Sequence, residues 1–235
     1  MSTAAASPVP PQFIPPTFEN MPAELKQRAN WLLWVALWVG LKWTKRPIQL
    51  SGFGASTTNP GHWSSFEDVR RAYERAAEQG GIVLREKTGH RFVPIGGVGF
   101  VFDNQPDEHG LVLAGIDFDR VVSIEGKIAS LAAERIRRLA SYCELSVSGS
   151  GLHIITKARP LAAGISHDGV EIYTGGRFFT MTGRTGSKTR TIVAAEREFA
   201  ALVDELLRAK GGGNALACNP QAGAANPNGT GYSPE

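Results

Sequence analysis

An apolar segment that ends on two aspartates constrains the fold of this chain more than any other feature. Residues 111–119 read LVLAGIDFD, which is typical of a buried strand with polar residues at its last positions. Side chains alternate between the two faces of a strand, so Asp117 and Asp119 lie on the same face. Two like charges this close repel each other, and a divalent cation between them is the usual solution. The simpler alternative pairs Asp119 with Arg120 while Asp117 caps the following turn.

A glycine- and serine-rich turn follows between two predicted strands. Residues 144–155 read ELSVSGSGLHII, so Ser148, Ser150 and Gly151 precede His153, which begins the second of these strands. Backbone N–H groups and hydroxyls in such a turn are donors that suit phosphate oxygens. Taken alone, the run is also typical of a flexible hairpin, and a lone histidine is typical of a satisfied polar residue. Downstream of the two aspartates, the turn predicts a phosphate-binding loop.

A third motif combines one carboxylate with one guanidinium. Residues 169–183 read GVEIYTGGRFFTMTG, which predicts a short strand, a tight Gly-Gly turn and a return strand. Glu171 lies on the first strand, and Arg177 leaves the turn with a planar charged group suited to phosphate. The alternative is a cross-strand salt bridge between these two side chains.

Together, the three motifs resemble those of the archaeo-eukaryotic primase superfamily, in particular the primase-polymerase proteins of phages and plasmids. The resemblance covers about residues 20–185. It implies that Asp117, Asp119 and Glu171 bind the catalytic metals, and Mg²⁺ or Mn²⁺ suits such an all-oxygen shell. It also implies a catalytic sheet like that of the RNA-recognition motif and a smaller N-terminal α/β lobe. The mixture of hairpins and a few helices independently indicates an α+β fold with helices on one face of a sheet.

The resemblance also assigns the residues that hold the incoming nucleotide. These are Ser148, Ser150, Gly151, His153, Arg177 and Lys45, with His153 counted among the catalytic residues because it contacts the triphosphate in this family. Many relatives have serine where this chain has Gly151 and aspartate where it has Glu171. Either Ser148 or Ser150 therefore remains the candidate phosphate-binding hydroxyl. The stretches KRP, ASTTNP and WSSF at residues 45–47, 55–60 and 63–66 resemble the family's approach to its first lobe.

The activity that the resemblance implies is template-directed nucleotidyl transfer from NTPs or dNTPs on single-stranded DNA, in phage or plasmid replication. A replicative helicase, in cis or in trans, is a further partner that it allows. The formal charge of +3 and pI near 9.0 permit a polyanionic partner. Arg184, Lys188 and Arg190 are candidate template contacts. The main alternative is a catalytically silent module that binds single-stranded DNA as a replication accessory, and a purely structural domain is another. A nicking endonuclease needs a histidine pair and a nucleophilic tyrosine, whereas His153 is alone on its strand.

Composition divides the chain into three parts. We expect a disordered arm at residues 1–19, a catalytic domain of two packed lobes at 20–210, and a disordered tail or linker at 211–235. The apolar run Trp31–Leu41 is too short to span a membrane and predicts a buried strand. Two cysteines without paired spacing favour a reducing cytoplasm.

Within the domain, the pattern predicts three helices and a series of short strands. The helices are expected at about residues 66–80, opened by a Ser64–Glu67 capping box, at 125–142 and at 193–209. The other strands are expected at residues 82–84, 97–102, 111–119, 145–148, 152–157, 170–173 and 178–182.

Overall fold

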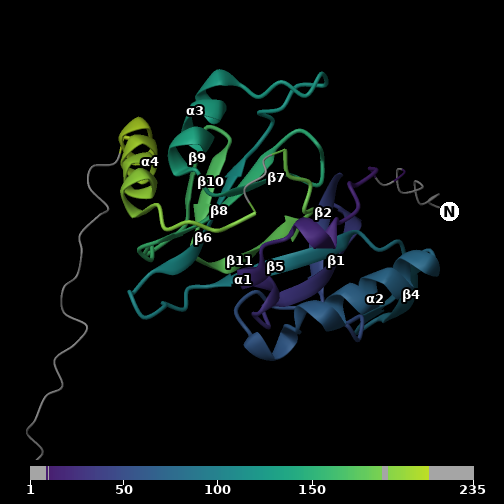
Figure 1. Cartoon of the computed structure of the whole chain (residues 1–235). Coiled ribbons are helices and arrows are strands. Elements are labelled where there is room, and N and C mark those ends of the chain that lie inside the picture. Colours follow the sequence, from purple (N-terminus) through teal and green to yellow (C-terminus); the bar gives the residue numbers. More distant parts are fainter. Residues whose placement is uncertain (1–8, 10, 187–189, 212–235) are drawn as a thin grey trace, which may run out of the picture.

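The computed structural model describes residues 9, 11–186 and 190–211, which form an α+β fold with two main antiparallel sheets (Figure 1). The expected fold class is confirmed, while the more specific likeness of the catalytic sheet to an RNA-recognition motif stays a prediction. The helical elements are η1 (Phe18–Asn20), α1 (Ala23–Lys26), η2 (Pro60–His62), α2 (Phe66–Glu78), α3 (Ser130–Leu139) and α4 (Glu196–Ala209).

The first sheet has four strands in the order β11-β5-β1-β2. Their bounds are β1 (Trp31–Val39), β2 (Lys42–Ile48), β5 (Gly97–Asp103) and β11 (Gly175–Met181). β1 is apolar along its whole length and buried over most of it, which confirms the strand expected for the tryptophan-rich run. Helix α2 packs on this sheet against β1 and β5.

The second sheet has five strands in the order β7-β8-β6-β10-β9. Their bounds are β6 (Val112–Phe118), β7 (Tyr142–Leu145), β8 (Leu152–Ala158), β9 (Ile165–His167) and β10 (Val170–Tyr173). One face packs under α3 and α4, where Ile116 and Ile154 meet Phe199 and Leu202. A separate hairpin pairs β3 (Ile82–Glu86) with β4 (Gly89–Val93). Figure 1 shows α3 and α4 at one side of the molecule and α2 at the other, with both main sheets between them.

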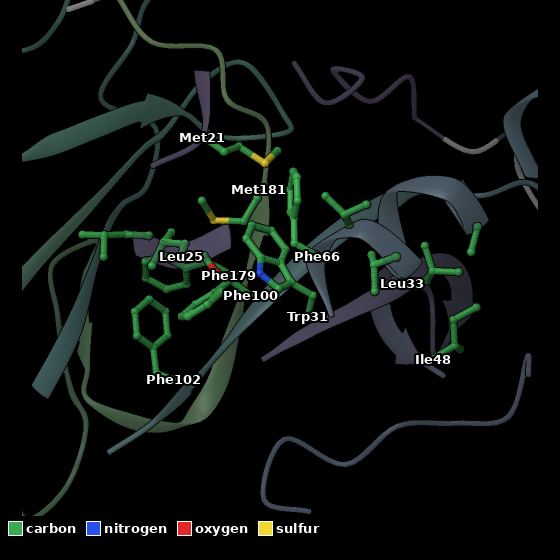
Figure 2. Close-up of a cluster of buried hydrophobic side chains, with 14 of the residues drawn as sticks. Met21, Leu25, Trp31, Leu33, Ile48, Phe66, Phe100, Phe102, Phe179 and Met181 are labelled. Atoms are coloured by element: carbon green, nitrogen blue, oxygen red, sulfur yellow. Dashed lines mark hydrogen bonds between the residues drawn. The ribbon is translucent and has the colours of Figure 1, made fainter. Parts of the chain in front are cut away.

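An aromatic core lies where the two main sheets meet. Trp31, Phe66, Phe100, Phe102 and Phe179 pack together in this core (Figure 2). It also includes three side chains of the five-stranded sheet, which are Leu113, Tyr142 and Ile155. Because side chains alternate along a strand, this sheet turns one set of residues to the helices and the other set to the four-stranded sheet.

Gly115 on β6 allows the close contact between the sheets. A Cβ atom at this position would lie 2.6 Å from the ring of Phe102 and 2.7 Å from that of Phe179. Real Cβ atoms do not approach ring carbons so closely, so a larger residue would force the sheets apart. Glycine at this position therefore matters for packing.

Two helices differ in detail from the sequence prediction. The N-cap of α2 is Ser65, whose Oγ accepts a hydrogen bond from the N–H of Asp68 at 3.2 Å, and not Ser64. The predicted helix at residues 125–142 is wrong at both ends, because α3 runs from Ser130 to Leu139. Gly126 adopts a left-handed φ of 77° in a turn before the helix, and after the helix the chain enters β7.

Two of the predicted strands need correction, and β2, β4 and β9 were not predicted. The strand expected at residues 145–148 ends at Leu145, because the following serines form the turn to β8. The expected return strand after Glu171 also exists, but β10 and β11 do not form a hairpin. β10 pairs with β6 and β9, whereas β11 pairs with β5 in the other sheet. The Gly-Gly turn therefore passes the chain from one sheet to the other.

Part of the expected disordered arm is packed on the domain. The N–H of Ile14 donates to the carbonyl of Val147 at 3.1 Å, and that of Thr17 donates to Thr182 at 2.7 Å. Phe13 contacts Trp34 edge to face with ring centroids 4.9 Å apart. Apolar residues within the proline-rich composition explain this difference. Residues 1–8 and the tail from residue 212 lie outside the described residues, and the domain boundaries stay predictions.

Candidate active site

A row of ionisable side chains crosses four neighbouring strands of the five-stranded sheet. The register places Asp117 on β6 directly opposite His153 on β8 and Glu171 on β10. His153 is in turn opposite Glu144 on β7. Residues directly opposite each other in antiparallel strands share a face of the sheet. The three separate sequence motifs therefore meet on the face that turns towards the four-stranded sheet.

Asp117 is at the centre of this row, and its side chain is 27% exposed. Its Oδ1 lies 3.7 Å from Nε2 of His153. Burial raises the pKa of Asp117 above its ordinary value; the nearby positive charges of His153 and Lys45 oppose this rise, and the negative charges of Asp119 and Glu171 add to it. The structure thus brings all five of these predicted site residues within electrostatic reach of one another.

The two other candidate metal ligands have no cationic partner in the described part of the chain. Asp119 is exposed just after β6, and its N–H donates to the carbonyl of Gly169 at 2.7 Å. Among the described residues, neither Asp119 nor Glu171 forms an ion pair with a lysine or arginine. The simpler pairings of Asp119 with Arg120 and of Glu171 with Arg177 therefore do not form.

The carboxylates suit a divalent metal in chemistry but are not gathered into a finished site. Within the described residues, no three Asp, Glu, His or Cys side chains lie close enough to hold an ion as they stand. Asp117, Asp119 and Glu171 nevertheless offer oxygen donors, and the charge of the partly buried Asp117 is destabilised chiefly by burial. This is the donor set that Mg²⁺ and Mn²⁺ prefer. Because the described side chains are not gathered around one point, metal binding stays a prediction.

The ring of His153 is held in place by a stacking contact and by a contact at one ring nitrogen. Its side chain is buried, and the ring stacks on Phe179 with centroids 4.6 Å apart and an interplanar angle of 25°. Nδ1 lies 3.3 Å from Oε1 of Glu144, which leaves Nε2 directed to Asp117. A histidine whose one nitrogen is occupied in this way presents the other in a defined orientation.

Glu144 is a residue that the sequence prediction missed. It is buried and accepts hydrogen bonds from the backbone N–H groups of Thr182 and Gly183, the latter at 2.7 Å, and from the hydroxyl of Tyr142 at 2.7 Å. A buried carboxylate is costly unless it is satisfied in this way. The signal in the sequence is a glutamate within an otherwise apolar strand, two residues after a tyrosine.

The serine-rich turn forms a connected set of hydroxyls. Oγ of Ser148 lies 3.0 Å from Oγ of Ser146 and 3.0 Å from Oγ of Ser150. Ser146 also accepts from the N–H of Gly151, and Gly149 turns the chain with a φ of 77°. Ser148 is exposed and Ser150 half-buried, so both remain accessible to a phosphate.

Gly151 has a packing reason of its own. A Cβ atom there would lie 2.7 Å from the carbonyl oxygen of Phe118 and 3.0 Å from Oγ of Ser146. No larger residue fits without a backbone shift. Glycine at this position, where the resembling family often has serine, is therefore required by the way the turn packs on β6.

Two basic residues come from the four-stranded sheet. Lys45 on β2 is exposed and lowers the pKa of Asp117 through its charge. The guanidinium of Arg177 on β11 lies 5.0 Å over the ring of Tyr173. The Tyr173 hydroxyl donates to Oε2 of Glu171 at 2.7 Å, and burial is the main reason that the pKa of Tyr173 rises to about 12. Tyr173, which the sequence prediction missed, thus connects the third carboxylate to the arginine.

Of the predicted template contacts, Arg184 lies beside β7, where its carbonyl accepts from the N–H of Leu145 at 2.8 Å. Arg184 is exposed and lines a cavity of about 550 Å³ with Cys143 and Leu145. These two β7 side chains pack into the core under α3 and α4, on the other face of the sheet. Arg190 is exposed, and Lys188 lies outside the described residues.

A second cavity, of about 680 Å³, lies beside the β10–β11 turn. Thr57 from the ASTTNP stretch lines it and donates from its hydroxyl to the carbonyl of Gly176 at 2.8 Å. Asn30 and Asp103 also line this cavity and contribute polar groups to it. None of the three candidate metal ligands lines this cavity.

Comparison with known proteins adds one relative. No family model matches the chain. It is similar to the DNA primase-polymerase of Nitratiruptor phage NrS-1, with 29% identity over 168 residues. This similarity supports a relationship to the primase-polymerase family. The matched region is 68% of this chain and 20% of the phage protein, so the chain corresponds to about one fifth of that relative's length.

The helices of the described residues are short or polar. In the described ranges, no helix has the length and apolar character needed to cross a bilayer.

Proposed function

We propose that this chain is the catalytic domain of a DNA primase-polymerase, which transfers nucleotides from NTPs or dNTPs to a 3′-hydroxyl on a single-stranded DNA template. The observation that carries the proposal is the in-register row of Glu144, His153, Asp117 and Glu171 across four strands. Three motifs recognised separately in the sequence supply this row. The similarity to a phage DNA primase-polymerase points to the same reaction class.

The carboxylates carry the acidic part of the proposed mechanism. Asp117, Asp119 and Glu171 would hold Mg²⁺ or Mn²⁺, which would supply the positive charge that nucleotidyl transfer needs at the attacking and leaving oxygens. Burial is the main cause of the raised pKa of Asp117, and the neighbouring charges of Asp119 and Glu171 add to it, so a bound cation would stabilise the ionised carboxylate. Tyr173 donates to Glu171 and keeps that carboxylate oriented towards the sheet face.

The donors around the carboxylates hold the triphosphate. His153, oriented by Glu144, and the hydroxyls of Ser148 and Ser150 contact its oxygens. Lys45 and Arg177 approach from the four-stranded sheet and balance the remaining charge. Their contribution is positioning and charge neutralisation, which is the main work of the protein in phosphoryl transfer.

The test is incorporation of labelled nucleotides on single-stranded DNA, with and without a primer, in Mg²⁺ or Mn²⁺. The native chain is compared with Asp117→Asn, Asp119→Asn and Glu171→Gln, which keep the side-chain size and remove the charge. Glu134→Gln on α3 is the matched control, because Glu134 is exposed on the helix side of the sheet. We expect product from the native chain and the control alone.

One further result would extend the proposal, and another would replace it with the main alternative. Synthesis without a primer adds priming to polymerisation. If the native chain binds single-stranded DNA but gives no product with either metal, the catalytically silent binding module replaces the polymerase proposal.

A further inference from the structure

The tip of the β1–β2 hairpin exposes apolar side chains. Val39 is 55% exposed and Leu41 86% exposed on either side of Gly40. Leu41 adopts a φ of 70°, a left-handed conformation that turns normally assign to glycine or asparagine. Leu41 therefore contributes nothing to the core, and its side chain is accessible to a ligand.

Two tryptophans pair across the hairpin behind this tip. Trp38 lies opposite Trp43 in the strand register, and their ring centroids are 5.5 Å apart at an interplanar angle of 59°. Both are half-buried, whereas Trp31 and Trp34 on the same strand are fully buried. Partly exposed indole rings in a pair are available for stacking with another flat group.

The hairpin has a basic character that matches a polyanion. Residues 31–48 contain Lys42, Lys45 and Arg46 and no aspartate or glutamate. Arg46 is engaged with Glu86 at 2.6 Å. Lys42 and Lys45, by contrast, have no ion-pair partner among the described residues and are exposed.

The hairpin belongs to the same four-stranded sheet as Phe179, which stacks on the candidate-site residue His153. Lys45 and Trp43 are two residues apart on β2, so they share a face of the strand and are about 7 Å apart along it. Trp43 is paired with Trp38 in the strand register, so Lys45 and both tryptophans lie on one face of the hairpin.

We propose that the β1–β2 hairpin binds single-stranded DNA, with Trp38 and Trp43 stacking on bases and Lys42 and Lys45 contacting phosphates. Such a combination of rings and lysines binds single strands without sequence preference, because every base has a face to stack. The description of this strand as the template rests on the proposed function, whereas the binding itself does not.

The test is the affinity of the whole chain for a labelled oligothymidylate, measured by fluorescence anisotropy and by quenching of tryptophan emission. Trp43→Ala and Trp38→Ala should each weaken binding about tenfold, which is typical for the loss of one stacked base. Lys42→Gln should reduce the slope of log affinity against log salt by about 0.7. Trp43→Phe keeps an aromatic ring and should restore most of the affinity.

The controls separate binding from folding and from catalysis. Phe92→Ala removes another exposed aromatic residue, on the separate β3–β4 hairpin, and should leave affinity unchanged. If both alanine variants bind like the native chain, or if they change only self-association, the hairpin proposal is overturned. That result would leave the polymerase proposal intact, provided that the native chain incorporates nucleotides. Conversely, hairpin-dependent binding by a chain that makes no product sustains this inference and removes the proposed function.

Discussion

The five-stranded sheet carries the acidic side chains of the candidate site, whereas the four-stranded sheet carries its lysine, its arginine and the exposed tryptophans. In the five-stranded sheet, Glu144, His153, Asp117 and Glu171 are ordered by direct strand register and by buried hydrogen bonds. In the four-stranded sheet, Lys45 and Arg177 are exposed, and the Arg177 guanidinium lies over Tyr173, which donates to Glu171. We therefore propose that the five-stranded sheet holds the catalytic groups and that the four-stranded sheet binds the nucleic acid.

The largest expected effect is a difference in steady-state kinetics between a variant of the five-stranded sheet and a variant of the four-stranded sheet. Asp117→Asn should lower kcat about 10³-fold, because a carboxylate that holds a metal contributes several kcal/mol of charge stabilisation. Lys45→Gln should raise the KM for the nucleotide about tenfold with little change in kcat, as expected for the loss of one charged phosphate contact. Steady-state kinetics of both variants test this division. Equal loss of kcat in both would contradict it.

The next effect concerns the buried glutamate that orders the acidic sheet. Glu144→Gln should lower the free energy of unfolding by about 2 to 3 kcal/mol, because a charged acceptor of several buried donors is replaced by a neutral amide. Denaturant unfolding of the native chain, this variant and the exposed control Glu134→Gln measures the difference. An unchanged midpoint for Glu144→Gln would mean that this carboxylate does not order the row.

The contact between the sheets can be tested at its tightest point. Gly115→Ala should destabilise the fold by about 1 to 3 kcal/mol, because the added methyl group meets the rings of Phe102 and Phe179. Gly186→Ala is the control, since a Cβ atom there has nothing within 4 Å. Thermal unfolding should distinguish the two. Similar midpoints would show that the two sheets separate easily.

The smallest expected effect is a gain in the folding stability of the Asp117→Asn variant when no metal is present. The raised pKa of Asp117 means that the folded state holds this proton more tightly than the unfolded state. Native stability from this group is therefore present below the ordinary aspartate pKa of about 3.9 and is lost as the pH rises through the raised value. In EDTA at neutral pH, Asp117→Asn should be slightly more stable than the native chain. Added Mg²⁺ should reverse the order, and unfolding curves in both conditions provide the check.

The local patterns predicted most elements but not all of their ends. Apolar runs located β1, β5, β6, β8 and β10, because burial on both faces needs continuous apolar sequence. The ends of α3 were missed because a turn around Gly126 and the start of β7 at Tyr142 interrupt a run with good helix formers. β9 has three residues, too few for a periodic signal.

The sequence by itself located the residues of the candidate site, because period-two alternation, a serine-rich turn and isolated polar residues in apolar strands are local properties. It located Asp117, Asp119, His153 and Glu171 as separate motifs. Tertiary structure decided which strands bring these residues side by side. It also decided that β11 pairs with β5 in the four-stranded sheet and not with β10. It also added Glu144 and Tyr173, whose partners lie across strands or in distant loops. Register between distant strands depends on the packing of the whole core, which no local pattern encodes.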